Sequence, residues 1–107
     1  TEETECAQNI DINNNVEFWV RNLERQEYNA FWLQTSTDKF YPDFIVKLNN
    51  GKIVVIEYKG EHLYGSEDSL EKRTIGNYWA LLTNNTCSFV MLKGRDWNRL
   101  NEYLLAK

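Results

Sequence analysis

Two carboxylates and one ammonium group stand out as side chains that could perform chemistry together. Asp43 follows the single proline of the chain, and Glu57 and Lys59 close an aliphatic segment with one residue between them. Side chains two residues apart on a strand lie on the same face, so Glu57 and Lys59 share one. Adjacent carboxylates supply the oxygen ligands that Mg²⁺ prefers, at about 2.0 to 2.1 Å per oxygen. If Asp43 joins them, the three residues form a metal site with an ammonium group beside it.

The turn between two apolar runs decides whether Asp43 faces Glu57. The runs flank the segment 49–51, Asn-Asn-Gly, which is typical of an antiparallel hairpin. A two-residue turn would place Asp43 opposite Tyr58 and turn it away from Glu57. A three-residue loop with positive φ at Gly51 pairs Asp43 with Glu57, with Cβ atoms roughly 4.5 to 5.5 Å apart. We therefore predict the three-residue loop.

The segment around these residues resembles a known nuclease signature. Pro42-Asp43, thirteen intervening residues and Glu57-Tyr58-Lys59 resemble the Pro-Asp…(Asp/Glu)-x-Lys motif, PD-(D/E)XK, of the restriction-endonuclease-like superfamily. The longer stretch 40–80 is similar to the carboxy-terminal endonuclease domain of type III restriction enzyme Res subunits and their helicase-fused relatives. The resemblance covers residues 5–92 and implies a restriction-endonuclease-like core.

The resemblance also implies a function and a set of site residues. The chain would be a Mg²⁺-dependent endonuclease domain that hydrolyses DNA phosphodiester bonds, with Mn²⁺ as a substitute ion. Asp43, Glu57 and the backbone carbonyl of Tyr58 would hold the metal, and Lys59 would orient the attacking water and offset developing negative charge. A glutamate on the first helix joins the site in such nucleases, and Glu5 is the position that would match. Acidic residues in a first turn also suit the helix dipole, so this alternative stays open for Glu5.

Several basic side chains are candidates for contacts with DNA. They are Arg21, Arg25, His62, Lys72 and Arg73. Single charges of this kind are also typical of a solvated surface, and that alternative stays open for each. His62 is the only histidine, so the sequence lacks the residues of a histidine-based metallonuclease.

Hydrophobic periodicity predicts an α/β domain in the order α-β-β-β-α-β-α, with a central mixed sheet and flanking helices. A first helix is expected over 1–11, a strand over 16–21, a short strand over 31–33 and a polar connection over 35–39, ahead of the hairpin. The inward residues of the first helix would be Cys6, Ala7 and Ile10, and those of the first strand would be Val16, Phe18 and Val20.

The second half of the chain predicts a helix, a strand and a helix. Asp68 and Glu71 have the spacing of a capping box, and the helix they begin would bury Ile75, Tyr78, Trp79 and Leu82. A strand is expected over 87–92, and Asp96 would cap a last helix. Most aromatic residues fall at core-facing positions, so packing explains them better than base stacking.

Length, charge and cysteine usage set outer limits. The chain of 107 residues is expected to form one domain, 1–107, as a fragment of a larger helicase or restriction polypeptide. Its net charge of −4 predicts weak DNA binding alone, so a helicase/ATPase domain of the same polypeptide or a modification methyltransferase subunit would supply basic surface. Cys6 and Cys87 lack ligand spacing and indicate a reducing, cytoplasmic location. No run is long enough for a membrane span.

Two alternatives to DNA cleavage follow from the same residues. The chain would serve as a DNA-binding or docking module if it kept the fold without cutting, although the intact Asp43, Glu57 and Lys59 count against this. An RNA substrate is the other alternative, because no residue in the pattern recognises or rejects a sugar 2′-hydroxyl.

Overall fold

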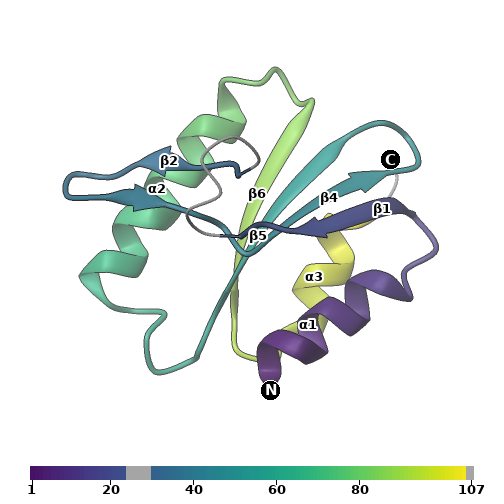
Figure 1. Ribbon diagram of the computed structural model, residues 1–107, viewed down its shortest axis with the longest axis horizontal. Helices are drawn as coiled ribbons and strands as arrows, with labels where there is room; N and C mark the ends of the chain where they lie inside the picture. The colour runs from purple at the N-terminus through teal and green to yellow at the C-terminus, as the bar shows by residue number, and fades with distance from the viewer. Residues whose placement is uncertain (24–29, 106–107) are drawn as a thin grey trace.

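The computed structural model describes residues 1–23 and 30–105 as an α/β fold. In chain order its elements are α1 (Glu2–Asp11), β1 (Val16–Arg21), β2 (Leu33–Gln34), β3 (Lys39–Phe40), β4 (Phe44–Leu48), β5 (Ile53–Lys59), α2 (Glu67–Leu81), β6 (Cys87–Lys93) and α3 (Trp97–Tyr103) (Figure 1). None of the helices in the described ranges is long and apolar enough to cross a membrane.

The main sheet has the strand order β1-β4-β5-β6. β1, β4 and β5 pair antiparallel, and β6 pairs parallel to β5 after the crossover through α2. The expected mixed sheet and the expected order of helices and main strands are therefore confirmed. β2 and β3 form a separate two-stranded sheet, where a single short strand and a polar connection were expected.

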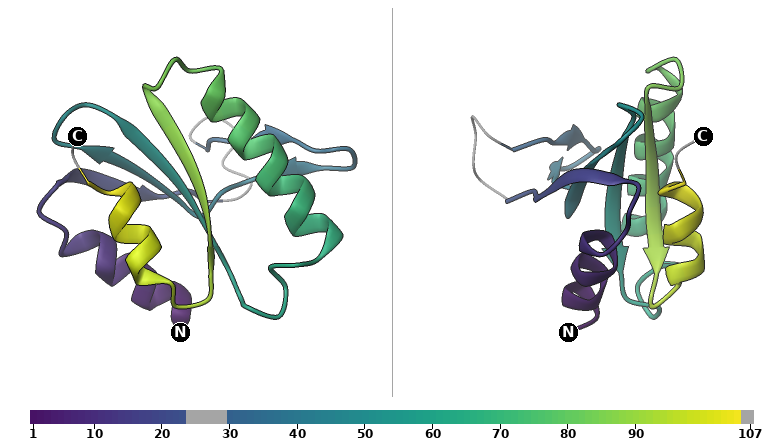
Figure 2. Two further views of the ribbon diagram at one scale, coloured as in Figure 1. Left: turned by 180° about the vertical axis from the view of Figure 1, so that it is seen from behind. Right: turned by 90° about the vertical axis from the view of Figure 1, so that its right-hand side faces the viewer.

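Helices and the small sheet cover both faces of the main sheet. Viewed from either side, α1 and α3 lie together on one side of β6 and α2 lies on the other (Figure 1, Figure 2). The core on the α1–α3 face comprises Cys6, Ile10, Phe44, Val46, Leu48, Val54, Ile56, Val90, Leu92, Leu100 and Leu104. The core on the α2 face comprises Phe40, Val55, Phe89 and Met91, with residues of β2 and α2 packed against it. Because β5 is covered on both faces, its apolar residues fix the strand that carries Glu57.

The central hairpin has the predicted three-residue loop. The Leu48 N–H donates to the Lys52 carbonyl at 2.8 Å, and the Gly51 N–H donates to the Leu48 carbonyl at 2.9 Å. Gly51 has φ +88°, the left-handed conformation that glycine tolerates. Phe44 pairs with Ile56, and one further step in this register sets the two predicted carboxylates, Asp43 and Glu57, opposite each other.

The inward face of β1 differs from the prediction. A bulge between Val16 and Phe18 shifts the register, so Trp19 and not Phe18 packs against the core. Phe18 and Val20 are exposed. One extra residue in a strand reverses the side chains that follow it, and simple alternation from Val16 misses this.

The start and the buried face of α2 also correct the prediction. The cap is Ser66, whose hydroxyl accepts a hydrogen bond from the Ser69 N–H at 3.1 Å, so Asp68 lies inside the helix. Tyr78 and Leu82 are exposed, while Gly76 is buried against Phe89. A Cβ atom at Gly76 would lie 2.5 Å from the Phe89 ring, which explains why this small residue faces the sheet.

The two outer helices follow the sequence pattern. Cys6 and Ile10 of α1 are fully buried, as predicted, and Asp96 caps α3 by accepting from the Arg99 N–H at 3.2 Å. Both cysteines are free thiols. Burial raises the pKa of the Cys6 thiol to about 12, so Cys6 acts as a small core residue.

Candidate metal-binding and catalytic site

The antiparallel ladder between β4 and β5 ends where the candidate residues begin. Pro42 would stand opposite Tyr58 in the register, but proline has no N–H to continue the ladder. Beyond this point, hydrogen bonds to side chains replace the backbone hydrogen bonds of the ladder. The Tyr58 N–H donates to Asp43 Oδ2 at 2.9 Å, and the Asp43 N–H donates to Glu57 Oε1 at 3.1 Å. These two bonds fix both carboxylates at the end of the hairpin.

Asn22 holds the entry to this corner and was not singled out from the sequence. Its amide nitrogen donates to the carbonyls of Phe31 at 2.7 Å and Pro42 at 2.9 Å, and its amide oxygen accepts from the Phe31 N–H. The Asn22 backbone N–H donates to the Asp43 carbonyl at 2.8 Å. This buried amide therefore ties β1, the segment before β2 and the Pro42–Asp43 peptide together.

The carboxyl groups of Asp43 and Glu57 lie next to each other and are largely buried. The Glu57 side chain is 8% exposed. Burial raises the pKa of Glu57 to about 9, and the neighbouring Asp43 charge acts in the same direction. Burial also raises the pKa of Asp43 to about 6, and a hydrogen bond from the Glu57 carboxyl lowers it. Without a cation, the pair therefore holds one proton at neutral pH.

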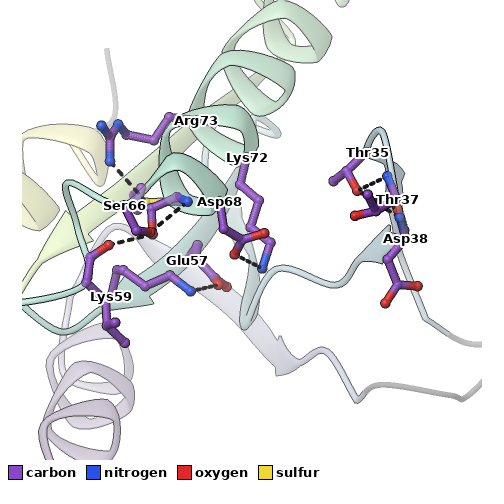
Figure 3. A network of polar contacts seen from close by, with 12 residues as sticks. Thr35, Thr37, Asp38, Glu57, Lys59, Ser66, Asp68, Lys72 and Arg73 are labelled. Atoms are coloured by element: carbon purple, nitrogen blue, oxygen red, sulfur yellow. Dashed lines mark hydrogen bonds and ion pairs between the residues drawn. The ribbon is translucent and has the colours of Figure 1, made fainter.

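Lys59 lies beside this pair on the same strand face. Its Nζ is 3.5 Å from Glu57 Oε2, and its side chain is 17% exposed. The lysine charge lowers the pKa of Glu57, against the effect of burial. Figure 3 shows the Lys59 amino group directed at the Glu57 carboxylate. The structure therefore brings together all three residues that the spacing singled out.

The acid of α1 that interacts with Asp43 is Glu3, and Glu5 interacts with Arg95 instead. Glu3 raises the pKa of Asp43 through its charge and a side-chain hydrogen bond. Glu5 instead accepts a hydrogen bond from Arg95 Nε at 2.8 Å. The sequence does contain the signal for Glu3, because positions 3, 6, 7 and 10 form one face of a helix whose other members face the core.

The candidate DNA-contact residues fall in different places. Arg21 forms a 3.0 Å salt bridge with Glu3, close to the carboxylates. Lys72 reaches the site from α2, and its charge lowers the pKa of Glu57. Arg73 donates to the Tyr64 carbonyl and packs over the Tyr64 ring, so it holds the loop before α2.

The other two candidates lie apart from the carboxylates or outside the structure's coverage. His62 is exposed and lines a cavity of about 290 Å³ between the start of α1 and the loops after β5 and β6. Arg25 lies outside the described residues.

The donor set fits a hard divalent cation held by few protein ligands. Asp43 and Glu57 offer two opposed carboxylates, and Pro42 cannot donate to the Tyr58 carbonyl beside them. Across the described ranges, no three His, Cys, Asp or Glu residues gather in a group that could hold an ion. Mg²⁺ suits such a site, because it is usually bound by one or two carboxylates, substrate phosphates and water.

The unfolding temperature in EDTA is expected to fall as the pH rises from roughly 5 to roughly 9. The cause is a difference in pKa between the folded and unfolded states, since unfolded carboxyl groups have pKa values of about 4. The folded values are about 6 for Asp43 and about 9 for Glu57. The native state therefore binds more protons in this window, so the free energy of unfolding decreases with pH. This stabilisation is complete below the unfolded pKa and is lost as the pH passes the folded values.

Differential scanning calorimetry across this pH range measures the effect. The matched control is the double variant Asp43→Asn/Glu57→Gln, whose amides do not titrate and should flatten the decline. An equal decline in the double variant would assign the pH dependence to other groups.

The chain matches no protein-family model, no curated protein and no solved structure in comparisons with known proteins.

Proposed function

We propose that this chain is a Mg²⁺-dependent endonuclease domain that hydrolyses phosphodiester bonds of DNA. The observation that carries the proposal is the pairing of Asp43 with Glu57 at the end of a hairpin, with Lys59 Nζ 3.5 Å from Glu57. The strand order supports it: a helix, three antiparallel strands, a crossover helix and a parallel strand agree with the restriction-endonuclease-like core that the resemblance implies.

Each residue of the corner has a role in this proposal. Asp43, Glu57 and the Tyr58 carbonyl hold the cation, and Lys59 orients the attacking water and stabilises charge on the phosphate. When bound, Mg²⁺ polarises a phosphoryl oxygen and lowers the pKa of coordinated water. Hydrolysis adds the hydroxyl of a water molecule to phosphorus and breaks one P–O ester bond, and the departing oxygen takes up the proton.

The charge of the chain predicts a low affinity for DNA, which a larger assembly would raise. A net charge of −4 opposes binding to a polyanion, because Lys and Arg supply most sequence-independent DNA affinity. In the proposal, a helicase/ATPase domain of the same polypeptide and a modification methyltransferase subunit provide the basic surface, within a cytoplasmic type III restriction-like system.

The alternative is a DNA-binding or docking module of the same fold that does not cut. The observation in its favour is the absence of a third carboxylate, histidine or cysteine in a metal-binding group across the described residues. The dehydrated carboxylate pair weighs against it, because a buried site that serves only docking gains nothing from two adjacent acids with raised pKa values.

Cleavage of an end-labelled DNA duplex tests the proposal. The protein should cut the duplex with Mg²⁺ or Mn²⁺ and stop when EDTA is added, and an RNA duplex of the same sequence is incubated in parallel. Binding of DNA without cleavage under any cation would favour the docking alternative, and cleavage of the RNA alone would reassign the substrate.

Mn²⁺ is expected to stabilise the folded protein, because an ion that binds only the native state adds about 2.7 kcal/mol at roughly 100 times its Kd. Thermal unfolding with and without Mn²⁺ measures this stabilisation. The control is Glu57→Gln, which retains an oxygen that accepts the Asp43 N–H but loses one charged ligand. If the wild type and Glu57→Gln respond alike, the ion binds elsewhere.

A further inference from the structure

We propose that Lys72 is a second catalytic cation of this site, whose ammonium group binds a non-bridging oxygen of the DNA phosphate that is cut. This inference rests on the proposed nuclease function and assigns one more residue to it.

The Lys72 side chain extends from α2 over the ring of Phe40. Lys72 lies in the second turn of α2, and its Nζ is 5.2 Å from the centroid of the Phe40 ring. Phe40 belongs to the core on this face of the sheet. The lysine stem therefore runs inward along an apolar surface toward the main sheet.

Glu57 lies between two lysines that come from different elements. Lys59 approaches it along β5, and Lys72 approaches it from α2 (Figure 3). A phosphate seated at the Asp43–Glu57 corner would therefore have an ammonium group on either side.

An ion pair with Asp68 is a simpler explanation for the position of the Lys72 amino group, because the two residues form an i,i+4 pair at 3.0 Å on α2. The exposure of the two partners is unequal, however. The Lys72 side chain is 22% exposed and the Asp68 side chain is 64% exposed. A pair that served only the helix surface would leave both groups in water, where neither loses hydration. The ion pair with Asp68 therefore does not account for the burial of the Lys72 side chain.

The negative charge of the carboxylates gives the inward-directed Lys72 a role in binding phosphate. The carboxylates of Asp43, Glu57 and nearby Glu3 repel an incoming phosphate. Arg21 is paired with Glu3, and Lys59 is the lysine paired with Glu57. A second fixed cation aimed at the phosphate stabilises charge that develops during hydrolysis, and it requires no rearrangement at that moment.

The first test compares single-turnover cleavage rates of matched variants. Lys72→Met keeps the apolar stem over Phe40 and removes the charge, and it should lower the rate by roughly 10²- to 10³-fold, the scale of losing one preorganised stabilising group. Lys72→Arg should restore part of that rate. Asp68→Asn removes only the helix pair and should stay within about threefold of the wild type, because an exposed pair contributes little.

Lys47 provides a control lysine away from the site. It lies near the loop end of β4, opposite the end that leads to Asp43, and pairs with Glu17 at 3.6 Å. Lys47→Met should cut DNA at the wild-type rate. Equal rates for Lys72→Met and Lys47→Met would overturn the inference, and so would equal losses in Lys72→Met and Asp68→Asn.

The second test uses DNA affinity and needs no cleavage. In a Glu57→Gln background without divalent cation, fluorescence anisotropy at several salt concentrations measures how strongly a short duplex binds. Adding Lys72→Met should weaken binding and reduce the slope of log affinity against log salt by about 1, as for one lost phosphate contact. An unchanged slope would contradict a phosphate contact at Lys72.

The two proposals fail in distinguishable ways. If the unaltered protein cuts DNA and Lys72→Met cuts equally fast, only the role of Lys72 is lost. If the unaltered protein cuts nothing with Mg²⁺ or Mn²⁺, the nuclease function and the catalytic role of Lys72 are lost together.

Discussion

Glu57→Gln is expected to lower the single-turnover rate of DNA cleavage by about 10³-fold or more. The physical reason is the loss of a charged metal ligand, since a bound metal supplies several kcal/mol of transition-state stabilisation and each ~1.36 kcal/mol changes the rate tenfold. Asp43→Asn should have an effect of the same size. Site-specific Mn²⁺ binding, measured by isothermal titration, should fall together with cleavage in both variants.

These substitutions separate function from folding because the new amide side chains keep the local hydrogen bonds. In Glu57→Gln the amide oxygen can still accept the Asp43 N–H, and in Asp43→Asn the amide oxygen can still accept the Tyr58 N–H. Removing one of two adjacent buried carboxylates should also raise the unfolding temperature of the metal-free protein above neutral pH. Loss of cleavage together with loss of folding stability would instead point to a structural role.

Lys59→Ala should separate catalysis from metal binding. The substitution leaves Asp43 and Glu57 in place and removes a positive charge 3.5 Å from Glu57. Mn²⁺ affinity should therefore hold or rise, because one repulsive charge is gone. If Lys59 stabilises charge that appears mainly in the transition state, the single-turnover rate should fall by roughly 10²- to 10³-fold.

Isothermal titration with Mn²⁺ and single-turnover cleavage on the same preparation measure both quantities for Lys59→Ala. Equal loss of metal binding in Lys59→Ala and Glu57→Gln would mean that Lys59 supports the site structurally. Undiminished cleavage by Lys59→Ala would remove the lysine from the mechanism.

Local chemistry was enough to predict the hairpin and its consequence. The Asn-Asn-Gly segment 49–51 has a glycine where positive φ is required, and only the resulting odd loop sets Asp43 against Glu57. The sequence therefore predicted both the turn and the pairing of side chains far apart in the chain. The helix cap at Asp96 was predicted for the same reason, since capping depends on residues within one turn.

The sequence pattern did not predict which side chains face the core where this depends on contacts with distant parts of the chain. The inward face of α2 is set by the close packing of Gly76 on Phe89, and hydrophobicity alone favoured Tyr78 and Leu82, which are exposed. In β1 a single bulge moved Trp19 inward. Both cases arise from tertiary packing, which outweighs the periodicity of an isolated segment.

The site shows the same division between local and distant information. Asp43, Glu57 and Lys59 are placed by one hairpin, and the sequence predicted their approach. The choice of Glu3 over Glu5 depends on the rotation of α1 about its axis and on Arg95, which is far away in the chain. The bonds of Asn22 to two distant segments, at Phe31 and at Pro42–Asp43, left no local signal.

Nicking of supercoiled plasmid by two identically purified proteins tests the central claim most directly. The wild type and the double variant Asp43→Asn/Glu57→Gln should be incubated with the plasmid in Mg²⁺ and, separately, in EDTA. The carboxylate pair at the hairpin end predicts nicked plasmid for the wild type in Mg²⁺ and intact plasmid in the other three reactions. Equal nicking by the double variant in Mg²⁺, or an intact plasmid in all four reactions, would contradict a nuclease site at Asp43 and Glu57.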